Sequence, residues 1–288
     1  MSRRRLSTGR KISRAFQYFT LILASIFVLM PLWSAFVASF KTASEYANST
    51  HISLPESFLH FDNYRAALFP EQQTGIGLVG AFANTLEILL FSLAVLILIG
   101  AAAGYALERF RFPGRLVIIG LYAMLAVVPQ ILTPVSTFQI LSFLGVVNTR
   151  WALVLLYSGA DIVSLLVLIQ FVRAIPVEID ESARIEGANY FQIFFRLIMP
   201  MMLPAISTVI ILRTVSIYND FVAPYLYASK PGDQTVSMIL YQMADVISGS
   251  SPTVIMATVI IVILPTLIAF FFIQKFIYAG ITQGAVKG

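Results

Sequence analysis

Four ionisable side chains stand inside long apolar runs of the chain, where they could bind an ion, move a proton or line a path for a polar solute. They are Glu87, Asp161, Arg213 and Asp220. A charge at the centre of a bilayer costs about 2.5 to 3.5 kcal/mol on insertion scales, so each should face a partner or a wet cavity. Arg213, Ser216 and Asp220 fall on nearly one helical face. With their neighbours Tyr218 and Asn219 they predict a polar stripe along a transport path.

Two of these charges are expected to pair. Counting about 1.5 Å per residue from the expected helix ends puts Arg213 and Asp161 at similar depth in the membrane. We therefore predict an ion pair between them, whereas Asp220 lies about 10 Å along the helix from Arg213, too far for contact. The alternative is that these polar groups hold helices together and take no part in transport.

The residue types and spacings that enzymes need are largely missing from the sequence. No G-x-x-x-x-G-K-[ST] motif is present, so the chain cannot cradle a nucleotide in the usual way. A G-x-G-x-x-G spacing at residues 75–80 opens an apolar run and lacks a βαβ setting, so we interpret it as chance. There is no cysteine, and the two histidines, His51 and His60, share one loop and make a poor metal site. We predict a protein that is not an enzyme and that binds no metal or cofactor of its own.

The composition predicts an all-α fold, a polytopic membrane protein with six transmembrane helices. Hydrophobic residues make up 58% and charged residues 11% of the 288 residues, whereas charged residues are roughly a quarter of a soluble domain. Gly100 and Gly104 form a small-xxx-small step that favours close helix packing over a pore constriction. Pro129 and Pro134 should kink or unwind the third span. The predicted spans are residues 16–40, 78–107, 116–143, 151–172, 201–227 and 252–278.

The distribution of lysine and arginine predicts the orientation. Residues 1–14 are rich in arginine and contain no acid, and the segments 108–115 and 173–200 each carry three arginines. Because cytosolic loops carry the excess of Lys and Arg, both termini and the 173–200 loop should be cytosolic. This topology explains the formal charge of +5 without nucleic acid. We therefore expect a cytosolic segment at 1–15, a permease domain at 16–279 and a cytosolic tail at 280–288.

The segment 175–200 is a long stretch in which charge returns between two apolar runs. Pro176 suits a first helical position, and the acids that follow it favour the positive end of the helix dipole. Gly187 can end a helix in the left-handed conformation, and Asn189 with Gln192 offers a cap for a second helix. The sequence therefore predicts a helix, a glycine bend and a second helix, exposed on the cytosolic side.

This segment resembles the EAA motif of ABC importer permeases, in which EAA is followed by a glycine and then by I-x-L-P at fixed spacing. Residues 218–228, YNDFVAPYLYA, resemble the WNDF-x-x-P segment of carbohydrate permeases, with Tyr218 in place of tryptophan. Further matches at 61–69, 105–115, 144–153 and the terminal GITQGAVKG extend the resemblance, to the maltose-type family, over nearly the whole chain. The residues at the positions of the EAA motif are Glu181, Ser182, Ala183, Gly187, Leu197, Met199 and Pro200, of which Ser182, Leu197 and Met199 are conservative departures from Ala, Ile and Leu.

The resemblance implies a subunit that imports a sugar or oligosaccharide across the cytoplasmic membrane of a prokaryote by alternating access. It implies three kinds of protein partner besides membrane lipid and the sugar: a second related permease, two ATP-binding cassette subunits that use ATP and Mg, and an extracytoplasmic solute-binding protein docking on 41–77 and 228–251. In that family the charge at Asp161 is unusual, so its pairing with Arg213 has no support from the resemblance. The residues implied to contact the ATPase are Glu181, Ser182, Ala183, Arg184, Gly187 and Pro200, and in the tail Gly284, Ala285, Val286, Lys287 and Gly288.

Two other classes of function fit parts of the sequence. An ion-coupled secondary transporter would use Glu87, Asp161 and Asp220 as ion or proton sites, but the exposed 175–200 segment and the lack of a detectable inverted repeat argue against it. A membrane anchor or assembly factor would need no polar stripe. It would also have no ATPase partner.

Overall fold

The fold was established from a computed structural model, which describes residues 8–69, 77–244 and 249–285. Every regular element in these ranges is helical, which confirms the all-α prediction. The chain divides into two compact units, which we describe separately. Unit 1 comprises Met1–Glu71 and Met243–Leu264, and unit 2 comprises Gln72–Gln242 and Pro265–Gly288.

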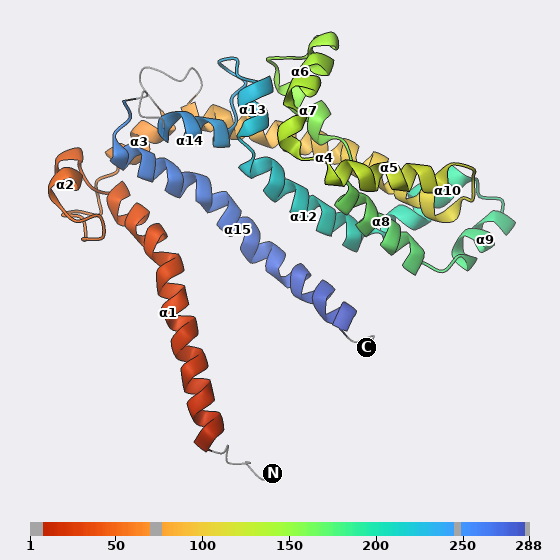
Figure 1. Ribbon diagram of the computed structural model, residues 1–288, viewed down its shortest axis with the longest axis horizontal. Coiled ribbons are helices and arrows are strands. Elements are labelled where there is room, and N and C mark those ends of the chain that lie inside the picture. The colour runs from red at the N-terminus through yellow and green to blue at the C-terminus, as the bar shows by residue number, and fades with distance from the viewer. Residues whose placement is uncertain (1–7, 70–76, 245–248, 286–288) are drawn as a thin grey trace. The chain divides into compact units, whose positions relative to one another are not determined.

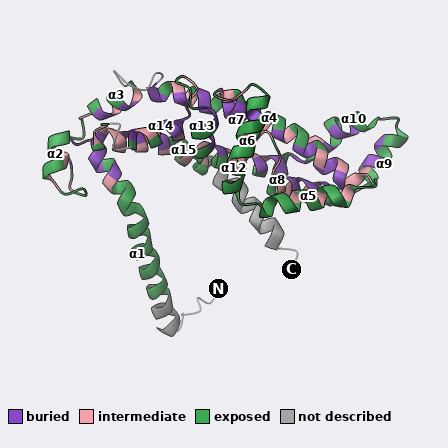
Figure 2. Ribbon diagram, turned by 45° about the horizontal axis from the view of Figure 1, so that its top comes forward, coloured by how far each residue is buried: buried purple, intermediate pink, exposed green. Residues whose placement is uncertain are grey.

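Unit 1 contains a long exposed helix and a compact loop. The described side chains of helix α1 are exposed up to Trp33 (Figure 2), and burial begins at Ala35. The Lys41 ammonium is fully buried and donates to Ser49 Oγ, the Thr50 carbonyl and Ser53 Oγ at 2.8 to 2.9 Å. The loop that was predicted to receive a binding protein is therefore folded around one lysine. The helices of unit 1 are α1 (Thr8–Ser39), α2 (Ala43–Asn48), α3 (Asp62–Leu68) and the first part of α15 (Pro252–Ala285).

Unit 2 is built around the 33-residue helix α4 (Gly77–Arg109). Helices α7, α8 and α12 pack directly on α4, and α5 packs on α8 (Figure 1). The remaining elements of this unit begin and end as follows: α5 (Arg115–Val127), η1 (Gln130–Leu132), α6 (Pro134–Phe143), α7 (Arg150–Tyr157), α8 (Ile162–Ala174), α9 (Glu178–Ile185), α10 (Tyr190–Ile193), η2 (Phe194–Ile198), α11 (Met199–Met201), α12 (Leu203–Asn219), α13 (Val222–Tyr227) and α14 (Val236–Ala244), the last of which ends in unit 1.

The helices agree roughly with the six predicted spans, but only three described helices are long and apolar enough to cross a membrane unbroken. These are Phe16–Ser39, Gly77–Arg109 and Pro252–Phe271. The third span is interrupted as its prolines predicted, because α5 ends at Val127 and α6 begins at Pro134. The fourth is bent by 45° between α7 and α8, and the fifth ends at Asp220, before α13. These last two breaks were not predicted.

The glycine step on α4 serves helix packing, as predicted. A Cβ built on Gly104 would lie 3.2 Å from Leu168 Cβ, and one on Gly100 would lie 3.2 Å from Leu168 Cδ1. Leu168 is on α8 and is buried. The two glycines therefore let α4 and α8 approach closely.

We expect Gly104→Val to destabilise unit 2, because overpacking a close contact typically costs about 1 to 3 kcal/mol. The thermal unfolding midpoint of the purified protein in detergent should fall by several degrees. Gly120→Val is the matched control, since a Cβ at Gly120 meets nothing within 4 Å. Equal midpoints for the two variants would contradict this account of the packing.

Candidate coupling unit and polar cavity

The predicted helix, bend and helix are present in the 175–200 segment, and we call residues 178–198 the coupling unit. Gly187 ends α9 with φ +89°, and the Ala188 N–H donates to the Ala183 carbonyl at 2.9 Å. Asn189 and Gln192 form a reciprocal cap at the start of α10, with both hydrogen bonds at 2.9 Å. The second helix then continues through the π-helical turn η2. The glycine bend and the second cap are thus realised as predicted, whereas Pro176 lies before the N-cap Val177 and not at the first helical position, which is Glu178.

The motif side chains divide between the two faces of α9. Glu181, Ser182 and Arg184 are exposed, and Glu181 has no ion pair among the described residues. Ala183 is only 8% exposed and packs in the apolar core, so it does not contribute to an exposed docking surface as we had expected. Pro200 is exposed at α11. The Arg184 guanidinium lies 5.2 Å from the Tyr190 ring centroid and bridges the glycine bend.

Three residues that anchor the coupling unit were not predicted. Asp180 on α9 is buried against Tyr105 and Arg109, which stand one turn apart near the end of α4. Their i, i+4 spacing was visible in the sequence, but the sequence did not show which loop they face. The anchors belong to different stretches of the chain, so local patterns could not connect them.

A polar cavity of about 660 Å³ lies where α12 ends. The Tyr157 hydroxyl donates to Asp220 Oδ2 at 2.9 Å, and Arg213 Nη2 lies 3.4 Å from the Tyr157 carbonyl oxygen. Asp220 Oδ1 also accepts from the Val222 and Ala223 N–H groups. Four members of the predicted stripe thus line the cavity: Arg213, Ser216, Asn219 and Asp220. The Nε atom of Arg213 is buried without a hydrogen bond to any described residue. The polar side chains of the lining are Thr133, Thr137, Tyr157, Arg213, Ser216, Asn219, Asp220 and Tyr227.

The predicted ion pair between Asp161 and Arg213 is wrong. Asp161 is the N-cap of α8, where it accepts from the Ser164 N–H at 3.3 Å and from the Ser164 hydroxyl. The break between α7 and α8 placed this carboxylate at a helix N-terminus, where free N–H groups compete for it. Arg213 contacts the carbonyl of Tyr157, the last residue of α7, instead.

Two other candidates for the transport path lie outside the cavity lining. Glu87 Oε2 pairs with Arg150 Nη1 at 2.5 Å, and Arg150 Nε lies 3.2 Å from Asp233 Oδ1. This cluster ties the start of α4 to α7 and to the loop before α14. Tyr218 packs against an apolar cluster that includes Ile217 and Tyr157. Glu87 and Tyr218 therefore help to hold helices together in this structure.

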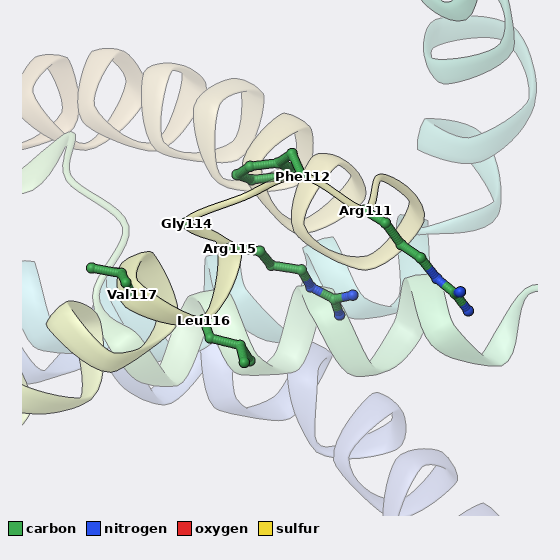
Figure 3. Close-up of a pocket in the computed structure, with 6 residues that line it drawn as sticks. All are labelled: Arg111, Phe112, Gly114, Arg115, Leu116 and Val117. Atoms are coloured by element: carbon green, nitrogen blue, oxygen red, sulfur yellow. The ribbon is translucent and has the colours of Figure 1, made fainter.

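The turn between α4 and α5 carries two further cations beside a small pocket of about 520 Å³ (Figure 3). In this view Arg111 and Arg115 extend to the same side of the turn, away from Phe112. Arg115 Nη2 lies 3.3 Å from Glu108 Oε2, and Glu108 also accepts two hydrogen bonds from Arg173. The turn is thus tied to α8.

Two remaining predictions concern the tail and metal binding. Gly284 and Ala285 are the last helical residues of α15, and residues 286–288 lie outside the described part of the chain. Among the residues that were described, no group of three or more His, Asp and Glu side chains could hold a metal ion.

The chain is similar to carbohydrate transport proteins along its whole length. It is 29% identical over 285 residues to the galactooligosaccharides transport system permease protein GanQ of Bacillus subtilis (strain 168), covering 98% of this chain and 99% of that protein. It is 31% identical over 271 residues to the probable starch degradation products transport system permease protein AmyC of Thermoanaerobacterium thermosulfurigenes, covering 92% and 94%.

The fold is also similar to that of a solved transporter. A chain of a bacterial ABC transporter involved in the import of the acidic polysaccharide alginate superposes with a TM-score of 0.80 at 21% identity, covering 94% of this chain and 98% of that one. The model of the family described as binding-protein-dependent transport system inner membrane component matches residues 1–283. The chain therefore belongs to this family of transmembrane permease subunits, which are not themselves enzymes.

Proposed function

We propose that this chain is a permease subunit of an ABC importer for a sugar or oligosaccharide in the cytoplasmic membrane of a prokaryote. The galactooligosaccharide and starch-product systems of its relatives support a carbohydrate substrate. The polar cavity suits such a solute, because it offers hydroxyl, amide and charged groups within an otherwise apolar unit. Transport proceeds by alternating access and involves no covalent chemistry.

The observation that carries the proposal is the form of the coupling unit. Glu181 and Arg184 are exposed on a short helix, whereas Asp180 and Ala183 hold that helix to the core. An exposed charged helix with a rigid glycine bend suits a cleft in a separate ATPase subunit. We infer that Glu181, Ser182, Arg184, Gly187 and Pro200 face that subunit, with Ala183 behind them.

The two ends of α4 support opposite sides of the membrane for the coupling unit and the loop before α14, and the arginine-rich segments indicate which side is cytosolic. Arg109 near its carboxyl end contacts the coupling unit, and Asn84 near its amino end donates to the Gly232 and Gln234 carbonyls. The 25 residues between these positions span about 37 Å, enough to cross about 30 Å of hydrocarbon. We propose that the coupling unit and both termini are cytosolic and that the 228–251 loop is on the outside.

The proposed assembly contains several subunits. A second related permease completes the cavity, and two ATP-binding cassette subunits bind ATP and Mg, which this chain does not. A solute-binding protein delivers the sugar to the loops at 41–77 and 228–251. The tail at Gly284–Gly288 reaches the ATPase subunits.

The direct test is uptake by the whole importer reconstituted in proteoliposomes with its binding protein. We expect uptake of an oligosaccharide to require ATP on the side of the membrane that carries the ATPase subunits. A protonophore should leave this uptake unchanged. Uptake abolished by the protonophore and indifferent to ATP would instead support ion-coupled transport.

We expect Gly187→Val to prevent assembly with the ATPase subunits or to uncouple hydrolysis from uptake. A β-branched residue strains the backbone at φ +89°, so the bend must change. Co-purification and the number of ATP molecules hydrolysed per sugar imported would measure this. Gly145→Val is the control, because Gly145 has φ +72° in a turn remote from the coupling unit. Equal defects in the two variants would argue against a specific role of the bend.

We expect Arg213→Gln to lower uptake about tenfold with assembly intact, because it removes the positive charge of the cavity lining. Asp161→Asn keeps a side-chain oxygen that can cap α8, so it should change stability little and leave uptake nearly unchanged. Because the two side chains make separate contacts, the double variant should show additive effects. A strongly non-additive effect in this double-mutant cycle would contradict the structure and support an ion pair between Asp161 and Arg213.

A further inference from the structure

The carboxylate of Asp180 is buried between the coupling unit and the end of α4. The Asp180 side chain is 11% exposed and that of Arg109 is 9% exposed. The Tyr105 hydroxyl donates to Asp180 Oδ1 at 2.6 Å, and Arg109 Nε lies 3.1 Å from Asp180 Oδ2. One carboxylate on α9 thus contacts two side chains of α4.

Arg109 also holds the backbone just before α9. Its Nη2 atom donates to the Ile175 carbonyl at 2.7 Å. One guanidinium therefore contacts both ends of the turn that starts the helix. The Nε to Oδ2 contact is close but lacks the alignment of a hydrogen bond. Its contribution is charge attraction, which is stronger in buried surroundings than in water.

Tyr105 extends these contacts to the second helix of the coupling unit. Its ring centroid lies 5.6 Å from that of Phe194 in η2, while its hydroxyl reaches Asp180 in α9. Asp180 and Ala183 are the buried residues of α9. The end of α4 is therefore a principal support of the whole unit.

We propose that Tyr105, Arg109 and Asp180 form a clamp that passes movement of the coupling unit to α4. The inference rests on the proposed coupling function. Asp180 acts as a positioning residue, because it lies on the buried face of α9 and away from the cavity. Separating the two side chains would leave a buried charge without its partner, which is energetically costly. We therefore expect α9 and the end of α4 to move together.

Movement of α4 has a route to the polar cavity. Gly100 and Gly104 hold α4 against Leu168 of α8, and α12 packs on both helices. The break between α7 and α8, and the end of α12, shape the cavity wall. Close packing transmits displacement because such contacts are not readily compressed.

The neighbouring residue of α4 provides an internal control. Glu108 accepts two hydrogen bonds from Arg173, at 2.9 and 3.1 Å, and so ties α4 to α8. The Arg173 side chain is 66% exposed. Arg173→Gln therefore removes an ion pair at the same end of α4 without touching α9.

The experiment uses the complete importer in proteoliposomes with its binding protein and a transported oligosaccharide. We expect Asp180→Asn to co-purify with its partners and keep basal ATP hydrolysis within about twofold, while sugar-stimulated hydrolysis and uptake fall about tenfold. Tyr105→Phe, which keeps the ring, should lower uptake about threefold. Arg173→Gln should behave as wild type. Combining Asp180→Asn with Arg109→Gln should cost less than the sum of the two changes, because both remove the same ion pair, although Arg109→Gln also loses the hydrogen bond to the Ile175 carbonyl.

Uptake by Asp180→Asn equal to that of Arg173→Gln would overturn the clamp and leave the proposed function intact. Failure of both Asp180→Asn and Tyr105→Phe to assemble would also overturn it, since the three residues would then serve only to hold the fold. A wild-type chain that never co-purifies with an ATPase subunit would instead sink the proposed function itself.

Discussion

A backbone N–H or C=O group without a partner in apolar surroundings costs several kcal/mol, and this constraint governs where the helices of unit 2 can break. At the break between α7 and α8, Asp161 accepts from the Ser164 N–H, and the Tyr157 carbonyl accepts from Arg213. At the end of α12, Asp220 accepts from the Val222 N–H at 2.9 Å. The charged residues inside the apolar runs are thus what makes broken helices tolerable there.

The same breaks create the polar cavity. A continuous helix satisfies its own backbone and presents apolar side chains, whereas a capped break brings charged groups and free carbonyls to one place. Tyr157, Arg213 and Asp220 converge because two breaks lie side by side in unit 2. A solute with many hydroxyl groups needs donors and acceptors of this kind along its path. Backbone satisfaction and the proposed recognition of a sugar therefore call on the same side chains.

The coupling unit was predictable because its signals are local. The glycine at 187 and the Asn189–Gln192 cap each act within one helical turn, and both appear in the structure. The proline breaks of the third span were predictable for the same reason. Pro176 marked the helix start only approximately, because α9 begins at Glu178. The fold class also followed from composition, since a chain so poor in charge must bury its helices in a bilayer or a core.

The contacts between distant helices were not predictable in this way. Depth counting assumed continuous helices, so it paired Asp161 with Arg213 and overlooked the competing N-cap. Glu87 was assigned to the path because it is a charge inside an apolar run, and its partner Arg150, 63 residues away, could not be identified from the sequence. Asp180 was read only as a favourable charge near a helix start, although its partners lie on α4. Each error arose where a side chain had several possible partners and only the packing of the helices selected one.

The hydrogen bonds and ion pairs of the carboxylates inside the apolar runs bear on the energy source for transport. An ion-coupled carrier needs an acid that can release its ligand, yet Glu87, Asp161 and Asp220 are each engaged by fixed donors: an arginine, a helix N-terminus, and a tyrosine with two N–H groups. Protonating any of them would weaken a contact that holds a helix end. The exposed carboxylate of Glu181, by contrast, has no partner within the described part of the chain. The geometry therefore favours transport driven by a neighbouring subunit that contacts the coupling unit over transport driven by an ion that binds along the path.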